Sequence, residues 1–319
     1  MKISRKQNKG QPTAILSADW HLRADTPRCR IDDYISAMQN KVDFIISLAK
    51  EHEIPILVAG DLGHKSQWPN WLLEWVIKKF KDVHIICIPG QHDLPNHKLE
   101  LTEQSGIGVL SAANVINLKK NSVSEWVSNG VDLYCYPYEQ EIKHQKIISA
   151  PPPNDKKNIC MTHQMIIKDK EDWPDQKATQ AKKLLMDFPE YNLILSGDNH
   201  QAFVVEYEGR LLVNPGSMMR NTTIQIDHQP RVYLWYKDTN EVEAVYLPIQ
   251  QDVISVDHII DKTEIDSRMA SYIERLKADV ELDLSFEDNL KNHLNINNIE
   301  SMVKNKIFKQ FPENSKLRV

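Results

Sequence analysis

The 319-residue sequence has few cysteines, no long apolar run and no excess of positive charge. Its four cysteines, Cys29, Cys87, Cys135 and Cys160, show no CxxC spacing, so we interpret them as reduced packing residues. No apolar run approaches the roughly 20 residues that a membrane-spanning helix needs, and the polar start MKISRKQNKGQ lacks the apolar stretch of a secretion signal. We therefore expect a cytoplasmic protein with no membrane partner.

The net charge of −5 argues against a chain that is basic throughout. It leaves room for a local basic patch that would hold a nucleic acid. The shares of hydrophobic (41%) and charged (26%) residues are those of an ordinary globular protein, which argues against a largely disordered chain. Charge alone leaves the partner open.

Short apolar segments rich in Ile, Leu and Val are predicted to form buried strands. They are TAILSA, PILVAG, HIICIPG, DLYCYPY, NICMTH, LILSGD and RLLVNPG. Residues 32–53, 70–80 and 175–188 carry apolar side chains at three- and four-residue spacing, which predicts amphipathic helices. This order predicts an α/β domain with mainly parallel strands, a class that binds ligands at the carboxyl ends of its strands. The later segments VVEYEGR, RVYLWYKD and EVEAVYLPI alternate between polar and apolar residues and are predicted to be antiparallel.

The character of the sequence changes after about residue 250. Apolar residues recur at helical spacing in residues 263–280, and residues 251–300 hold twelve acidic side chains against five basic ones. We therefore divide the chain into a main domain, residues 1–250, and a small helical C-terminal module, residues 251–319.

Polar side chains follow five of the predicted strands, at the point where each strand ends. They occur in SADWH (Asp19, His21), AGDLGH (Asp61, His64), PGQHD (Gln91, His92, Asp93), MTH (His163) and SGDNH (Asp198, His200). Each motif alone is weak, because a lone DxH is commonly a turn and a lone histidine is commonly a hydrogen-bonded structural residue. Since the carboxyl ends of parallel strands share one edge of a sheet, we expect these side chains to meet there.

The residue types indicate divalent metal ions. Carboxylate, imidazole and amide groups suit ions such as Mn²⁺, Fe²⁺, Zn²⁺ or Mg²⁺. The candidate ligands exceed what one ion needs, which indicates two ions that share a carboxylate. They are Asp19, His21, Asp61, Gln91, His163, Asp198 and His200.

The ordered motifs resemble those of the calcineurin-like metallophosphoesterases over roughly residues 13–220. The resemblance implies one ion held by Asp19, His21, Asp61 and His200, and a second held by Asp61, Gln91, His163 and Asp198. It also implies the family fold, a four-layer α/β sandwich of two mixed sheets flanked by helices. The activity implied is hydrolysis of phosphodiesters with two divalent ions, of which we expect Mn²⁺, with Mg²⁺ or Fe²⁺ as alternatives.

Within the family, GDLGH, the later YPY and NPGSMMR resemble SbcD-like nucleases of double-strand-break repair and recombination, and GQHDLPNH is similar to phage-encoded relatives. This resemblance implies DNA as substrate, cleaved as an exonuclease or an endonuclease. It implies an SMC-like ATPase of the SbcC type as partner, which residues 251–319 would dock or cap. A homodimer stays open.

The resemblance also implies roles for residues beside the metals. His92 would donate a hydrogen bond or proton near the leaving oxygen, with Asp93 orienting its ring, and His64 would contact the scissile phosphate. The alternatives are a buried polar pair and a loop histidine without a task. Ser217 and Arg220 in PGSMMR could support the site, touch the DNA backbone or form a simple turn.

Two residues depart from the family pattern. Gln91 stands where asparagine is usual, and Asp198 replaces a metal-binding histidine. A carboxylate at residue 198 makes the second site harder and more negative, which favours Mn²⁺ or Mg²⁺ over Zn²⁺. Two other functions stay open: a small-molecule phosphodiesterase or phosphatase with the same metal core, and a catalytically weak scaffold that binds a partner ATPase.

Overall fold

A computed structural model describes residues 10–121, 124–128, 130–145, 156–168 and 178–256 of the chain. The predicted C-terminal module, residues 251–319, lies outside the described residues except for its first six, so it stays a prediction. No helix in the described ranges is long and apolar enough to cross a membrane.

The first of two six-stranded sheets has the order β14-β13-β1-β2-β3-β4. Strands β1 to β4 run parallel, while β13 pairs antiparallel with both β1 and β14. The bounds are Ala14–Ser17 (β1), Ile56–Val58 (β2), Ile85–Cys87 (β3), Asn117–Leu118 (β4), Arg231–Tyr236 (β13) and Glu241–Tyr246 (β14).

The second sheet has the order β11-β12-β10-β7-β6-β5, with β6, β7, β10 and β12 parallel and the outer strands β5 and β11 antiparallel to their neighbours. The bounds are Ser124–Ser128 (β5), Val131–Tyr136 (β6), Lys157–His163 (β7), Leu193–Gly197 (β10), Phe203–Tyr207 (β11) and Arg210–Asn214 (β12). A small parallel pair joins Ile166–Ile167 (β8) and Thr179–Gln180 (β9). The predicted parallel strands and the later antiparallel strands are confirmed.

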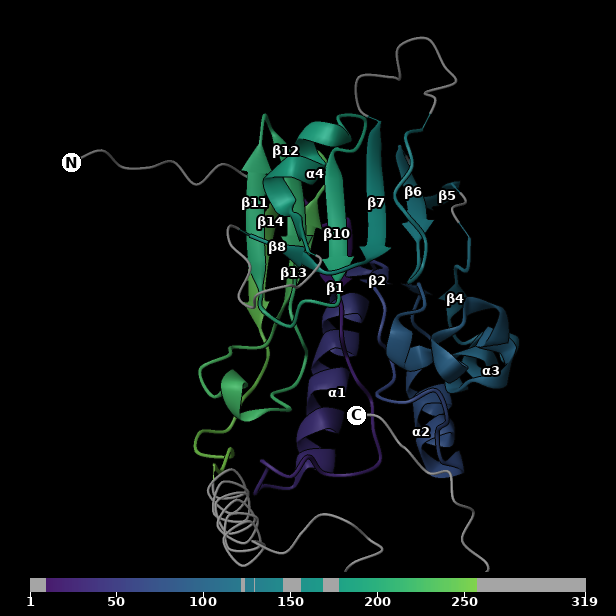
Figure 1. The fold of residues 1–319 in the computed structure, drawn as a ribbon, viewed down its shortest axis with the longest axis vertical. Coiled ribbons are helices and arrows are strands. Elements are labelled where there is room, and N and C mark those ends of the chain that lie inside the picture. The colour runs from purple at the N-terminus through teal and green to yellow at the C-terminus, as the bar shows by residue number, and fades with distance from the viewer. Residues whose placement is uncertain (1–9, 122–123, 129, 146–155, 169–177, 257–319) are drawn as a thin grey trace, which may run out of the picture. The chain divides into compact units, whose positions relative to one another are not determined.

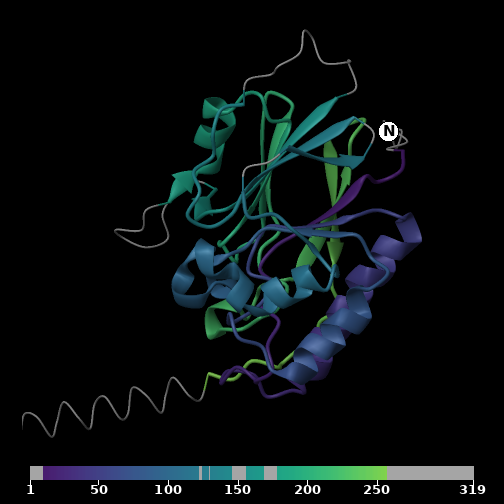
Figure 2. The ribbon, with the colours of Figure 1, turned by 90° about the vertical axis from the view of Figure 1, so that its right-hand side faces the viewer.

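The helices cover the outer faces of the two sheets (Figures 1 and 2). Helices α1 (Tyr34–His52), α2 (Asn70–Phe80) and α3 (Gly106–Ala112) pack on the first sheet, and α4 (Ala181–Asp187) packs on the second. Short 3-10 turns complete the described elements: η1 (Gln91–Asp93), η2 (Pro95–His97), η3 (Leu99–Gln104) and η4 (Thr223–Gln225). The order helix, sheet, sheet, helix is the predicted four-layer sandwich.

Strand β1 begins with an apolar run, Ala14 to Leu16, because both of its faces are buried. Ile15 contributes to the core beneath the helices, whereas Ala14 and Leu16 contribute to the core between the sheets. Successive side chains of a strand point to opposite faces, so a strand buried on both faces needs a continuous apolar run. Burial of each such Ile or Leu contributes roughly 1.5–3 kcal/mol.

Helix α1 follows its sequence pattern closely. Asp33 caps its start by accepting a hydrogen bond from the backbone N–H of Ser36, and the helix ends at His52, before Glu53 with a left-handed backbone and the Pro55 that follows. The prediction for residues 175–188 was too long, because Thr179 and Gln180 form β9 and α4 begins at Ala181.

Candidate metal centre

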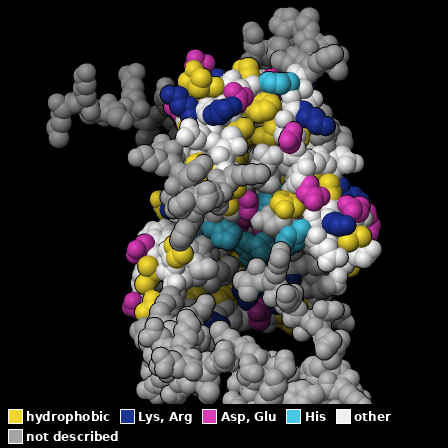
Figure 3. Space-filling view, viewed as in Figure 1, with side chains coloured by type: hydrophobic (Ala, Val, Ile, Leu, Met, Phe, Trp, Pro, Cys, Tyr) yellow, Lys and Arg dark blue, Asp and Glu magenta, His cyan; other side chains and the backbone are white. Residues whose placement is uncertain are grey.

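Segments from both sheets bring the predicted ligands together. In chain order they come from the ends of β1 (Asp19, His21), β2 (Asp61), β3 (Gln91), β7 (His163) and β10 (Asp198, His200). The first three strands belong to one sheet and the last two to the other, so the prediction of a single shared edge is wrong. The carboxyl ends of two facing sheets meet instead, and histidines gather in the middle of one face of the molecule (Figure 3).

The backbone is strained at several of these ligands. The φ angle is 50° at Asp19, 47° at His21, 50° at Asp61 and 78° at Asp198. Residues other than glycine seldom adopt this left-handed region, and such outliers cluster at functional sites, where the surrounding structure holds them in place. The tight turns after the strands therefore aim ligand side chains at one point at a cost in backbone energy.

One group of donor atoms belongs to Asp19, His21 and His200, all within 4.8 Å of one another. The Nε2 atoms of His21 and His200 lie 3.0 Å apart, and Nε2 of His21 lies 3.7 Å from Oδ2 of Asp61. At this distance the two imidazole nitrogens are placed to bind the same cation through their lone pairs. The first predicted ligand set is therefore together in space.

A second group joins Asp19, Asp61 and His163. Nε2 of His163 lies 3.5 Å from Oδ2 of Asp61, while its Nδ1 donates a hydrogen bond of 2.7 Å to the carbonyl oxygen of Ala59. This backbone contact fixes the ring and leaves Nε2 to face the carboxylates. On the same side, Gln91 donates from its side-chain amide to Oδ1 of Asp198 over 2.6 Å.

Several polar atoms of these residues are buried without a hydrogen-bond partner. They are Oδ2 of Asp19, Oδ2 of Asp61, Oε1 of Gln91 and Nε2 of His163. Buried polar atoms nearly always have a partner, so four unsatisfied polar atoms in one place need an explanation. Oxygen and imidazole donors are ligands for divalent ions, and the residues present fit such ions.

Two glycines allow the close approach of the ligand loops. A Cβ atom on Gly90 would lie 2.2 Å from Oδ1 of Asp61, and one on Gly60, whose φ is 86°, would lie 2.2 Å from Nδ1 of His163. Neither space admits a side chain. Close packing of the ligand loops therefore requires glycine, which has no Cβ, directly before Asp61 and directly before Gln91.

The buried charges of the site perturb one another. Burial acts to lower the pKa of the His163 imidazole, but the carboxylates of Asp61, Asp19 and Asp198 raise this pKa to about 10. Burial acts to raise the pKa of Asp61, but His163 and His21 outweigh it and lower that pKa. Burial raises the pKa of Asp19 well above its usual value. Asp61 is thus more firmly ionised than Asp19, which suits a ligand shared between cations.

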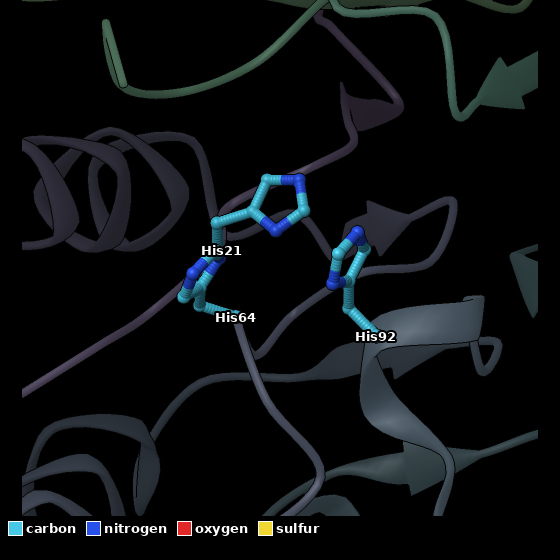
Figure 4. Close-up of side chains that lie close together, drawn as sticks. All are labelled: His21, His64 and His92. Atoms are coloured by element: carbon cyan, nitrogen blue, oxygen red, sulfur yellow. The ribbon is translucent and has the colours of Figure 1, made fainter. Parts of the chain in front are cut away.

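His64 and His92 lie close to His21, which is one of the proposed metal ligands (Figure 4). The rings of His64 and His92 are nearly parallel, with centroids 5.7 Å apart, and Nε2 of His92 lies 4.0 Å from Oδ2 of Asp61. Burial, assisted by Arg23, lowers the pKa of His64 to about 4. His64 is therefore neutral near pH 7, while 41% of the His92 side chain is exposed at the mouth of the site.

Asp93 is placed differently from its predicted role. It is fully buried, and it accepts hydrogen bonds from the backbone N–H groups of Leu62 (3.3 Å), Gly63 (2.7 Å) and Gly90 (3.0 Å). Its carboxylate thus faces backbone amides rather than the ring of His92. Asp93 ties the loop after β2 to the turn after β3, and so fixes the distance between Asp61 and Gln91.

Ser217 and Arg220 support the fold beside the site. The hydroxyl of Ser217 donates to the carbonyl oxygen of Met219 and accepts from the amide of Gln225. Arg220 is only 5% exposed and donates to the carbonyl oxygens of Ile226 and Gln250. Of the three alternatives left open by the sequence, contact of Arg220 with a DNA backbone is the one that this burial disfavours.

Asn214 is a positioning residue that the sequence reasoning missed. Its side-chain amide donates to the carbonyl oxygens of Asn199 and Gln201, on either side of His200, over 2.6 Å each. The sequence held a signal for this residue. Asn214 is a polar residue at the end of the apolar run RLLV, just as the other motif residues follow apolar runs of their own.

Residues 13–202, more than half of the chain, match the model of the calcineurin-like phosphoesterase family. The chain is 25% identical over 291 residues to the DNA double-strand break repair protein Mre11 of Sulfolobus acidocaldarius, a match that covers 83% of this chain and 71% of that protein. It is 27% identical over 143 residues to Mre11 of Saccharolobus solfataricus, covering 42% of this chain and only 36% of that relative.

Among solved structures, a putative 5'-nucleotidase from Staphylococcus aureus is 12% identical, covers 80% of this chain and 58% of its own, and has a TM-score of 0.44, too low to add to the argument. The family match covers strands β1 to β10 and the clustered aspartates, histidines and glutamine at the facing ends of the two sheets. The chain therefore belongs to the calcineurin-like phosphoesterases, hydrolases that act on phosphoester bonds with divalent metal ions.

Proposed function

We propose that this phosphoesterase is a two-metal DNA nuclease of the double-strand-break repair or recombination type, acting in the cytoplasm. The similarity to Mre11 proteins supports DNA as the substrate. The shape of the site is the observation that supports this proposal most strongly. One cavity of about 560 Å³ adjoins Asp198 and His200, and another of about 440 Å³ adjoins Gln91 and His92. A phosphodiester at the ligands would have room for a group on either side, as a nucleic-acid strand requires.

In this proposal, Asp19, His21, Asp61 and His200 hold one ion, and Asp61, Gln91, His163 and Asp198 hold the other. The ions would activate water as a nucleophile and neutralise charge on the phosphate oxygens. Mn²⁺ is the ion that we propose, because carboxylate and amide oxygens are hard ligands.

The protein's own groups would position the phosphate and move the proton. The backbone N–H of His92 donates to Oδ1 of Asp61 over 2.9 Å, which fixes the start of its turn beside the metal ligands. The half-exposed ring of His92 would donate a proton toward the leaving oxygen. His64, stacked beside it and neutral, would hold a phosphate oxygen through a ring N–H. Asp93 would act indirectly, by fixing the loops.

We further propose an SMC-like ATPase as the partner that opens or feeds the duplex, docked through residues 251–319. Nucleases of this kind can be weak alone, so a negative result with DNA is repeated with that ATPase added. A homodimer stays open.

The test compares three substrates with Mn²⁺ present: linear duplex DNA, single-stranded DNA and a chromogenic phosphodiester. We expect cleavage of DNA, and a loss of at least a hundredfold in kcat for His92→Ala with metal content unchanged. Cleavage of the small ester alone, with and without the ATPase, would assign the site to small-molecule substrates. Survival of all three substrates, with fewer than two ions bound per chain, would indicate a scaffold.

A further inference from the structure

Three cationic side chains are buried together away from the metal ligands. Arg30, Lys41 and Arg220 have only 8%, 3% and 5% of their surfaces exposed. They line one cavity of about 230 Å³ beside the first turns of α1. Ser36, Asn40 and Gln250 add polar groups to its wall, and Ala37, Pro248 and Ile249 form the apolar part. We call it the cationic pocket.

The charges of the cationic pocket do not balance. Arg30 forms a bidentate ion pair with Asp32, in which Nε donates to Oδ1 over 2.7 Å and Nη2 donates to Oδ2 over 2.5 Å. Lys41 donates instead to the carbonyl oxygen of Met218 over 3.0 Å, and Arg220 donates to carbonyl oxygens only. Among the described residues, neither has a carboxylate partner.

One further carboxylate lines the pocket. Asp33 is exposed, and both of its oxygens accept hydrogen bonds from Ser36 as the cap of α1. It therefore lies at the rim. The charge of the two buried cations is offset only in part, by Asp32, which is already paired with Arg30.

Many N–H groups in the pocket are also unused. An ammonium group has three donors and a guanidinium has five, and Lys41 uses one of its three. A buried charge without a partner is costly, and the protein shows this cost: burial, then the nearby Arg30 and Arg220, lowers the pKa of Lys41 to about 7. An anion in the cavity would remove the imbalance.

We propose that the cationic pocket binds a phosphate-type oxyanion, supplied either as inorganic phosphate or as the phosphate group of a free nucleotide. Guanidinium and ammonium groups donate strong charge-assisted hydrogen bonds to such oxygens. The cavity is several times larger than a single water molecule, so a tetrahedral anion fits. Asn40, exposed at the rim, adds an amide donor.

The pocket is distinct from the metal centre but adjoins it. Met218, whose carbonyl oxygen receives the hydrogen bond of Lys41, donates its own N–H to the carbonyl oxygen of Asp19 over 3.1 Å. The pocket shares no side chain with the metal ligands. Because the metal centre also binds phosphate when loaded with ions, the test uses metal-free protein and does not depend on the substrate of the enzyme.

The experiment measures binding of inorganic phosphate to the full chain, stripped of metal and desalted, by titration calorimetry and by the midpoint of thermal unfolding. Ionic strength is kept constant with chloride. We expect one saturable site per chain and a midpoint that rises with phosphate. Lys41→Met should weaken binding at least tenfold. Asn40→Asp, at an exposed helix position that keeps the fold, should weaken it severalfold by repulsion.

Lys183→Met is the matched control, because it removes one positive charge from an exposed pair on α4. It should bind phosphate as the unchanged protein does. A second titration with AMP separates the two sources: tighter binding than phosphate assigns a nucleotide, and equal or weaker binding assigns inorganic phosphate. Absence of saturable binding by either ligand, or unchanged affinity in both Lys41→Met and Asn40→Asp, would overturn the proposal.

Discussion

Gln91 donates a hydrogen bond of 2.6 Å to Asp198, while its own amide oxygen stays buried without a partner. These are the two residues at which the sequence is expected to depart from the family motifs, and they are in contact. We therefore treat the two expected departures as one pair at the proposed second metal site, where the amide of Gln91 reaches the carboxylate of Asp198.

The first prediction concerns metal preference. Asp198→His replaces a hard, negative ligand with an imidazole, so the activity with Zn²⁺ relative to Mn²⁺ should rise severalfold. Phosphodiester hydrolysis with each ion measures this ratio. Equal activity of the unchanged protein with both ions, or a gain of Mn²⁺-dependent activity in the variant, would contradict the role given to Asp198.

The second prediction is that the two departures are coupled. Residues in contact give interaction energies of about 0.5–3 kcal/mol in double-mutant cycles. The affinity for the second Mn²⁺ in Gln91→Asn, Asp198→His and the double variant should therefore deviate from additivity by at least about 0.5 kcal/mol. Strict additivity would show that the hydrogen bond between the two side chains does not matter for the metal.

The third prediction uses Gly90. Its substitution by alanine places a Cβ 2.2 Å from Oδ1 of Asp61, so Asp61 must move. Gly90→Ala should lower stability by about 1–3 kcal/mol and abolish tight metal binding. Gly209→Ala is the control, because no atom lies within 4 Å of its Cβ. It should lose some stability, since its φ is 72°, and keep its metal affinity; equal metal affinity in both variants would count against the steric argument.

The fourth prediction is that metal binding releases a proton. In the metal-free protein the pKa of His163 is raised to about 10, so its ring is protonated at pH 7 and must lose that proton to become a ligand. Metal affinity should rise by up to tenfold per pH unit between pH 6 and 8. Calorimetry in two buffers of different ionisation enthalpy measures the released proton, and a pH-independent affinity would remove His163 from the ligand set.

The fifth prediction concerns Lys41 without phosphate. Its pKa falls from 10.5 in the unfolded chain to about 7 in the fold, so the unfolded chain binds more protons between these values and stability rises with pH across that range. Lys41→Met should raise the thermal midpoint at pH 6 to 7, and the gain should fade above pH 10. A pH-dependence unchanged by the substitution would show that Lys41 is not the titrating group; Lys183→Met is again the control.

The sequence by itself determined the candidate ligands and the parallel strands. A strand buried on both faces must be apolar along its whole length, so a polar residue at its end stands out against the run before it. Such local contrast identified Asp19, Asp61, His163 and His200 without knowledge of where the strands lie. Helix α1 was equally predictable, because its apolar spacing and its Asp33 cap depend on residues close together in the sequence.

Only the tertiary structure decided what these residues face. It distributed the ligands over two sheets, turned Asp93 toward the backbone amides of Gly63 and Gly90, and brought Gln91 against Asp198. It also gathered Arg30, Lys41 and Arg220, which are 190 residues apart at the extremes, around one cavity. Contacts between segments so far apart in the sequence depend on how the layers pack. The spacing of residues along the chain does not reveal that packing.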